Sequence, residues 1–136
     1  MDHSGDLGLS AEGSTLPKAF ENAAGGLYAL TAVAVPKSPS GVRTFRMTAD
    51  SPEELLVNFL NRLIYLFDAK QFLGGRTAVK IKRAKNGRLS LAASVKGERY
   101  DGDKHGRGFL LKAATWHGLK VARSDRGWEL EVVFDI

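Results

Sequence analysis

The fold of this chain is decided by residues 51–68, which read Ser-Pro-Glu-Glu-Leu-Leu-Val-Asn-Phe-Leu-Asn-Arg-Leu-Ile-Tyr-Leu-Phe-Asp. Ser51, followed three residues later by Glu54, forms a capping box, and Pro52 stands in the first turn, where a helix tolerates proline. Apolar residues then recur at helical spacing and form a broad stripe: Leu55, Leu56, Phe59, Leu60, Leu63, Ile64 and Phe67. The stretch predicts an amphipathic helix that ends near Asp68.

A second helix is predicted upstream of it. Thr15 precedes Leu16-Pro17, a helix cap followed by an early proline, and apolar residues keep helical spacing as far as Thr31. Two adjacent glycines, Gly25 and Gly26, cost this helix about 1 kcal/mol each relative to alanine. Their presence indicates that a neighbouring element comes close at this point.

The remaining segments alternate between apolar and polar residues, as half-buried strands do. Strands are predicted over 6–13 and 42–49. Two hairpins are predicted as well. Lys85-Asn86-Gly87 joins 77–84 to 88–96, and Asp125-Arg126-Gly127 joins 109–123 to 128–136. The polar stretches 36–41 and 101–108, rich in glycine, proline or serine, are expected to be loops.

These elements predict an α+β fold, with two helices packed on one face of a mostly antiparallel sheet of about six strands. A chain of 136 residues that is 43% hydrophobic and 26% charged indicates a single globular domain over residues 1–136. The chain has no cysteine, which excludes disulfides and thiolate chemistry. No secretory signal is visible, and the apolar stretch 25–35 is too short to cross a bilayer. We expect a cytoplasmic protein with no membrane partner.

The net charge is +5, and basic residues gather around one hairpin turn: Lys80, Lys82, Arg83, Lys85 and Arg88. A basic excess favours phosphate-bearing partners through the release of counterions. The simpler interpretation is a solvated hairpin whose lysines discourage aggregation through the sheet edge. Trp116 and Trp128 have the chemistry to stack on bases, but aromatic residues of a sheet usually belong to the core.

Three polar clusters, far apart in the chain, have the composition of a site. They are Asp2-His3-Ser4-Gly5-Asp6-Leu7-Gly8, then Lys112-Ala113-Ala114-Thr115-Trp116-His117, and finally Asp135. A tight turn at 125–127 predicts that Asp135 lies opposite Trp116, His117 or Gly118 on the neighbouring strand. Spacing alone does not say whether the N-terminal strand borders this hairpin.

If it does, Asp2, Asp6 and Asp135 would bring three carboxylates together, and their repulsion would require a compensating cation. Lys112, a protonated histidine such as His117, or a divalent metal would serve. Oxygen ligands favour Mg²⁺, Mn²⁺ or Ca²⁺ over zinc. The alternative is that Asp6 caps a turn, Asp2 frays at the terminus and Asp135 pairs with a surface lysine.

Other motifs of catalytic, nucleotide-binding or metal sites are incomplete or absent in this sequence. The segment 101–106 begins like an EF-hand, but Lys112 stands at the twelfth position, where the loop requires a glutamate. The chain contains no nucleophile elbow, Walker loop, G-x-G-x-x-G or H-E-x-x-H, so we expect no organic cofactor.

Four stretches in the same order resemble the archease family over nearly the whole chain. They are the N-terminal cluster, residues 60–68 (Leu-Asn-Arg-Leu-Ile-Tyr-Leu-Phe-Asp), residues 112–119 (Lys-Ala-Ala-Thr-Trp-His-Gly-Leu) and the ending Val132-Val133-Phe134-Asp135-Ile136. The resemblance implies an accessory protein, itself no enzyme, that activates an RtcB-type tRNA-splicing RNA ligase by promoting guanylylation and multiple turnover. It would contact tRNA only indirectly, through the ligase. The residues that match the family's functional positions are Asp2 or Asp6, Lys112 and Asp135.

Two other functions compete with this one. An RNA-binding chaperone that acts through the basic hairpin would show salt-sensitive affinity for RNA and be indifferent to Asp135→Asn. A metal-dependent phosphoesterase that uses the carboxylate cluster would turn over a phosphate ester by itself with Mn²⁺.

Overall fold

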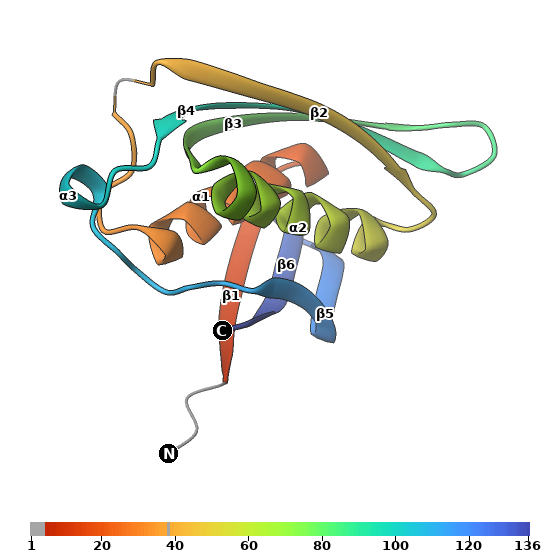
Figure 1. Ribbon diagram of the computed structural model, residues 1–136. Coiled ribbons are helices and arrows are strands. Elements are labelled where there is room, and N and C mark those ends of the chain that lie inside the picture. Colours follow the sequence, from red (N-terminus) through yellow and green to blue (C-terminus); the bar gives the residue numbers. More distant parts are fainter. Residues whose placement is uncertain (1–4, 38) are drawn as a thin grey trace.

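The computed structural model describes residues 5–37 and 39–136 (Figure 1). It contains three helices and six strands in the order β1 (Asp6–Gly13), α1 (Leu16–Thr31), β2 (Gly41–Ala49), α2 (Pro52–Lys70), β3 (Phe72–Arg83), β4 (Leu89–Arg99), α3 (Gly102–His105), β5 (Ala113–Ser124) and β6 (Gly127–Asp135).

Both long helices begin at the caps that the sequence predicts. The Thr15 side chain accepts a hydrogen bond from the Lys18 backbone N–H at 3.2 Å, and Ser51 accepts one from Glu54 at 3.1 Å. The Glu54 carboxylate in turn accepts from the backbone N–H of Asp50 at 2.8 Å. These side chains satisfy donors that a helix N-terminus leaves without partners, and this fixes where each helix starts.

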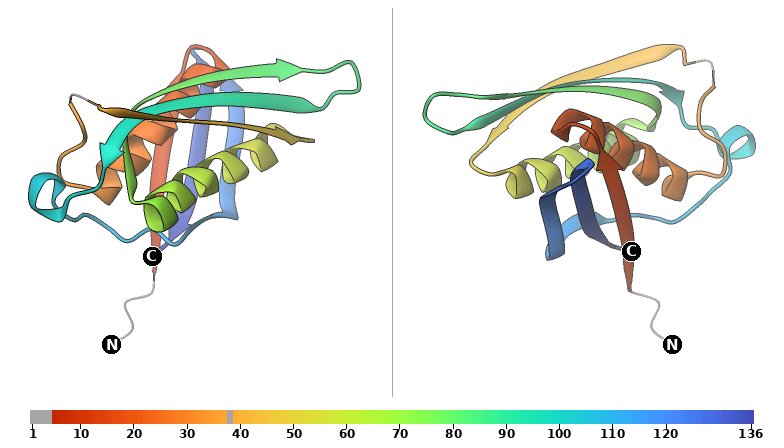
Figure 2. Two further views of the ribbon diagram at one scale, coloured as in Figure 1. Left: turned by 45° about the horizontal axis from the view of Figure 1, so that its top comes forward. Right: turned by 180° about the vertical axis from the view of Figure 1, so that it is seen from behind.

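The six strands form two antiparallel sheets of three, in the orders β1-β6-β5 and β2-β4-β3. The α+β class, the two long helices and the six strands are confirmed. The expectation of one sheet with helices on a single face is corrected, because α1 and α2 lie between the two sheets (Figures 1 and 2). The described part of the chain therefore has three layers: sheet, helices and sheet.

The width of the apolar surface on α2 explains the second sheet. Its buried residues are Leu55, Leu56, Val57, Phe59, Leu60, Leu63, Ile64 and Leu66, which extend over much more than one helix face. A stripe of about 100° is enough to cover one sheet, and a wider one stays exposed unless a second layer covers it. Helix α2 therefore contacts strands of both sheets.

The adjacent glycines of α1 behave as the sequence indicates. A Cβ atom on Gly26 would lie 2.6 Å from a methyl carbon of Leu9, so the absence of a side chain lets β1 pack closely on the helix. A Cβ on Gly25 would meet open space. One of the two glycines therefore marks the close approach of a neighbouring element.

The polar stretch 101–108 is more ordered than the expected loop. It contains α3, and the side chain of His105 is buried there. His105 Nδ1 accepts from the backbone N–H of Asp101 at 3.0 Å, and Nε2 lies 2.6 Å from the Glu98 carboxylate. The Tyr100 ring stacks on the imidazole. Because Nδ1 is an acceptor, the proton shared with Glu98 sits on Nε2.

No helix in the described part of the chain is long and apolar enough to cross a membrane. The cytoplasmic location remains a prediction from the sequence.

Candidate functional site

Strand pairing brings the N-terminal and C-terminal carboxylates together. β1 pairs with β6 so that Asp6 lies directly opposite Asp135, and the Ile136 backbone N–H donates to the Gly5 carbonyl at 3.2 Å. On the other side of β6, the Lys112 backbone N–H donates to the Asp135 carbonyl at 2.8 Å. The structure thus joins Asp6, Lys112 and Asp135 from three distant parts of the sequence.

These residues line an open hollow of about 460 Å³ at one end of the sheet. We call it the charged end and define it by its lining: Gly5, Asp6, Lys112, Asp135 and Ile136. Like charges directly opposite each other on paired strands destabilise the pairing, so Asp6 and Asp135 favour a nearby cation. Within the described residues, Lys112 forms no ion pair with either carboxylate, and its exposed side chain is available to an outside group.

The predicted position of Asp135 opposite Trp116, His117 or Gly118 is wrong, because Asp135 lies opposite Ala113. Near the turn the register is regular, with Ser124 opposite Gly127 and Lys120 opposite Glu131. The pairing then shifts between Thr115 and Lys120.

Because β5 has extra residues in this irregular stretch, the residue opposite Asp135 is Ala113, next to Lys112, and not one of residues 116–118. Trp116 and His117 are exposed within the stretch, and His117 does not line the charged end. Gly118 there has a φ of 66°, a left-handed conformation that glycine adopts freely. Trp128, by contrast, packs against the core from β6, as expected of a sheet aromatic.

Asn61 is a contributor to this site that the sequence reasoning missed. It lies on α2, and its side-chain oxygen accepts from the Ala114 backbone N–H at 2.8 Å while its amide nitrogen donates to the Ala114 carbonyl at 3.4 Å. Asn61 thus takes the place of a neighbouring strand at the open edge of β5, two residues from Lys112. The sequence does contain a sign of this role, because Asn61 is a polar residue beside the apolar stripe of α2.

The charged end continues into an acidic outer face of the β1-β6-β5 sheet. Glu12 lies opposite Glu129 and Ser10 opposite Glu131, while the alternate residues of the strands face the core. Lys120 on β5 lies 3.5 Å from both Glu129 and Glu131. This acidic face carries Asp6, Glu12, Glu129, Glu131 and Asp135.

The carboxylate oxygens of Asp6 and Asp135 are suitable ligands for a hard cation, but they are the only two acidic side chains that line the charged end within the described residues. Within residues 5–37 and 39–136, no group of three His, Cys, Asp or Glu side chains is placed to hold a metal ion. Asp2 lies outside the described residues. Mg²⁺ in proteins is commonly held by one or two carboxylates and completes its coordination with water and phosphate oxygens. Asp6 and Asp135 fit that shared mode of binding.

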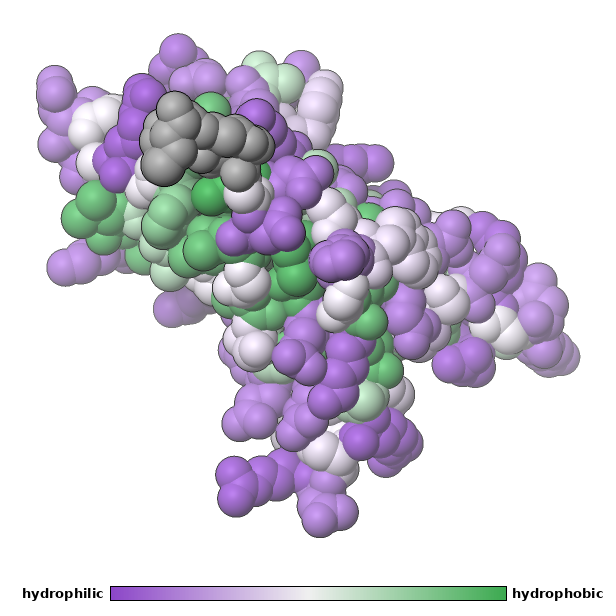
Figure 3. All heavy atoms as spheres, turned by 90° about the horizontal axis from the view of Figure 1, so that it is seen from below, coloured by the Kyte–Doolittle hydropathy of each residue, from purple (hydrophilic) through white to green (hydrophobic). Residues whose placement is uncertain are grey.

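Two exposed hydrophobic residues, Phe109 and Leu110, come shortly before Lys112 in the sequence. The α3–β5 segment pairs with the end of α1 through hydrogen bonds from Gly108 N to the Thr31 carbonyl and from Phe109 N to the Leu30 carbonyl. Phe109 and Leu110 are 49% and 65% exposed. The face of the molecule seen from below carries a band of hydrophobic side chains beside hydrophilic ones (Figure 3). Exposed apolar surface of this kind is typical of a protein–protein contact.

A family model, curated relatives and a solved structure all match this chain over nearly its whole length. The model of the "Archease protein family (MTH1598/TM1083)" matches residues 1–136. "Protein archease" of Pyrobaculum calidifontis is 36% identical over 137 residues, which cover 99% of this chain and 92% of the relative. "Protein archease" of Pyrococcus furiosus is 34% identical over 137 residues, with 99% and 95% covered.

The solution structure of protein 1598 of Methanobacterium thermoautotrophicum superposes with a TM-score of 0.79 at 25% sequence identity. The match covers 100% of this chain and 96% of that one. The fold is therefore that of a small α+β protein already known from a solved relative. The chain belongs to the archease family.

Proposed function

We propose that this chain is an accessory protein of an RtcB-type tRNA-splicing RNA ligase, and that it promotes guanylylation and multiple turnover of that ligase. Membership of the archease family supports the accessory role in tRNA processing. The observation that carries the finer proposal is the meeting of Asp6, Lys112 and Asp135 in one exposed hollow. An exposed site suits a protein that presents charged groups to a partner better than one that encloses its own substrate.

The charged end would act on the nucleotide in the ligase. Asp6 and Asp135, with Asp2, would hold a divalent cation (Mg²⁺, Mn²⁺ or Ca²⁺) in common with the phosphates. Such a cation neutralises phosphate charge and orients the oxygens for nucleotidyl transfer. Lys112 would place its ammonium group against a phosphate oxygen or between the two carboxylates, and the acidic groups would stay aligned because β1 and β6 hold them in register.

The neighbouring surface would bind the ligase itself. Phe109 and Leu110 are large, exposed and close in sequence to Lys112, so the same contact that brings Lys112 to the nucleotide would bury them. Burying apolar area contributes about 25 cal/mol per Å², which supports affinity while the charged groups supply specificity.

Ligase guanylylation with GTP and Mn²⁺, measured with and without this protein, tests the proposal. Asp135→Asn and Lys112→Ala are expected to lose most of the stimulation. The matched controls are Asp125→Asn, at the opposite end of the β5–β6 hairpin, and Lys70→Ala at the end of α2; both are exposed and are expected to stimulate normally. Full stimulation by Asp135→Asn and Lys112→Ala would refute the assignment.

A phosphoesterase would give a different result. It would hydrolyse a phosphate ester with Mn²⁺ in the absence of the ligase, and Asp135→Asn would abolish that turnover. We propose that the chain alone does not catalyse, so the same preparations incubated without ligase are expected to release no phosphate.

A further inference from the structure

The outer face of the β2-β4-β3 sheet is basic and contains no acidic residue along its central length. Its outward side chains come from residues 42–48 of β2, 90–96 of β4 and 76–82 of β3, where alternate residues face the helices and are largely buried. The basic residues on this face are Arg46, Arg76, Lys80, Lys82 and Lys96. No aspartate or glutamate occurs in any of the three stretches.

This face is hollowed along its middle. Two adjoining hollows of about 590 and about 650 Å³ share Arg46, Ala92 and Lys80 as lining residues. Arg46 lies opposite Ala92 on one side and Lys80 lies opposite Ala92 on the other. Small residues of the central strand β4 thus form a floor, and long basic side chains of the two edge strands form walls. We call this surface the basic trough.

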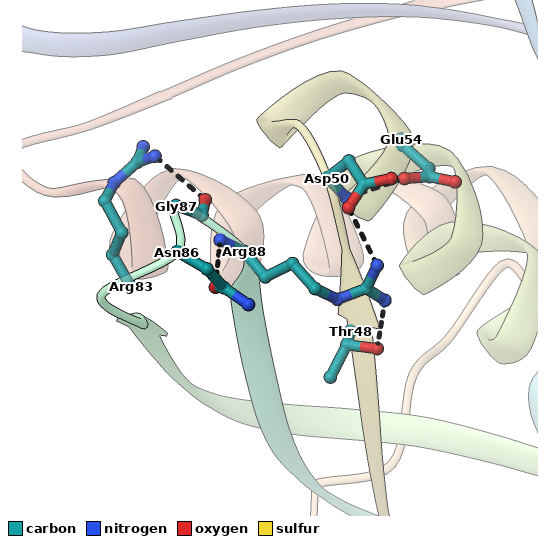
Figure 4. Close-up of polar contacts among 7 residues, drawn as sticks. All are labelled: Thr48, Asp50, Glu54, Arg83, Asn86, Gly87 and Arg88. Atoms are coloured by element: carbon teal, nitrogen blue, oxygen red, sulfur yellow. Dashed lines mark hydrogen bonds and ion pairs between the residues drawn. The ribbon is translucent and has the colours of Figure 1, made fainter.

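The basic side chains of the trough have no acidic partners within the described residues, although the neighbouring Arg88 has one. Arg88 donates to Asp50 and to Thr48, both at 2.7 Å, and Arg83 donates to the Gly87 carbonyl at 3.2 Å (Figure 4). Arg88 thus ties the β3–β4 turn to β2, while the bond of Arg83 lies within the turn itself. The basic cluster of the sequence therefore divides into arginines used by the fold and lysines left available to a ligand.

Acidic residues at both ends of the face are already paired. Asp50 is held by Arg88 at 2.7 Å. Glu98 lies 2.8 Å from Lys104 and 2.6 Å from His105. The attraction of the trough for an anion is therefore not cancelled by free carboxylates on the same face.

We propose that the basic trough binds the sugar–phosphate backbone of RNA directly. Lys80 and Lys82 are two residues apart on β3, or about 7 Å, a spacing similar to that of successive phosphates. Arg46 and Lys80 stand on strands about 10 Å apart, which leaves room for a backbone between them. The choice of RNA over DNA rests on the proposed function.

The composition of the trough favours nucleic acid over an acidic protein. Protein interfaces are anchored by aromatic side chains, and none faces outward here. The same absence argues against stacking on bases, so contact would be through phosphates and independent of sequence. The trough also lies on the opposite outer layer from the acidic face, which leaves the charged end open to the ligase while RNA is bound (Figure 1).

Fluorescence anisotropy with a labelled tRNA transcript, using this protein alone over a range of salt concentrations, tests the proposal. The triple variant Arg46→Gln, Lys80→Gln and Lys82→Gln is expected to bind at least about 10-fold more weakly, and the slope of log affinity against log salt is expected to fall by about 2 to 3. Lys37→Gln, Lys70→Gln and Arg126→Gln form the control, because they remove the same charge from exposed sites outside the trough. The control is expected to change affinity less than about 2-fold.

An equal loss of affinity in the control would overturn the proposal, because net charge alone would then explain binding. So would an unchanged salt slope in the trough variant, or displacement of RNA by a polyglutamate peptide as readily as by unlabelled RNA. Ligase guanylylation separates this proposal from the preceding one, since the trough variant is expected to stimulate normally. If the unaltered protein fails to stimulate the ligase, the proposed function fails, and the binding result still decides whether the trough takes RNA.

Discussion

Replacing Asn61 by alanine tests how the site is held together. Asn61 is the link between α2 and the edge of β5 at Ala114, two residues from Lys112. The substitution removes both side-chain hydrogen bonds and leaves the backbone N–H and carbonyl of Ala114 without their partner. Ala114 is only 5% exposed, so water replaces that partner poorly.

The expected destabilisation follows from those two groups. A buried polar group left unpaired costs about 1 to 3 kcal/mol, and the bond at 2.8 Å contributes more than the one at 3.4 Å. Alanine recovers roughly 0.5 kcal/mol because it favours a helix more than asparagine does. We therefore expect Asn61→Ala to lower the free energy of unfolding by about 2 kcal/mol.

Urea denaturation measures this change, and amide hydrogen exchange at Ala114 locates it. Asn58→Ala is the control, because Asn58 is exposed one turn earlier on the same helix and its side chain makes no hydrogen bond within the described residues. The control is expected to be neutral or slightly stabilising. If Asn61→Ala is no more destabilising than Asn58→Ala, or if exchange at Ala114 is unchanged, Asn61 does not hold β5 in place.

Three further outcomes are expected. Tyr28→Phe should raise the free energy of unfolding by about 1 kcal/mol, since the buried Tyr28 hydroxyl has no hydrogen-bond partner among the described residues; destabilisation in a thermal melt would contradict this. Gly25→Ala should stabilise by about 1 kcal/mol, whereas Gly26→Ala should gain less because its Cβ meets Leu9, and equal gains in urea midpoints would count against the close packing of β1. Hydrogen bonds from Lys104 and His105 lower the pKa of Glu98 below its ordinary value of 4.5, so this pairing stabilises the fold above that pH and is lost as pH falls through the lowered pKa. The free energies of unfolding of Glu98→Gln and of the unaltered protein should therefore converge as the pH is lowered. A difference that stays constant from pH 7 to pH 3 would show that the Glu98 pairing does not contribute in this way.

Local sequence patterns determined most of the secondary structure. The caps at Thr15 and Ser51 set the starts of α1 and α2, and Asn86-Gly87 set the β3–β4 turn, because each acts through hydrogen bonds or backbone angles within a few residues. The stretch 101–108 departs from this rule. Its order depends on Glu98 and Tyr100, which a reading of the loop alone does not include.

The candidate site was predicted in its composition but not in its geometry. Asp6, Lys112 and Asp135 were each singled out by residue type, and the turn at 125–127 gave the correct register for the nearer half of the last hairpin. The irregularity between Thr115 and Lys120 then changed the partner of Asp135. The turn sets the register only as far as the pairing stays regular, so it carries no information about an irregularity farther along the strand.

Two features belong to the tertiary structure alone. The number of layers depended on how much of α2 is apolar around its whole circumference, and that surface needed a second sheet to cover it. The separation of charge into an acidic face and a basic trough depended on which strands share a sheet, since each face combines charged residues from strands that are distant in the sequence. Sequence fixes what each strand can present on its outer side, and only pairing decides which side chains stand next to one another.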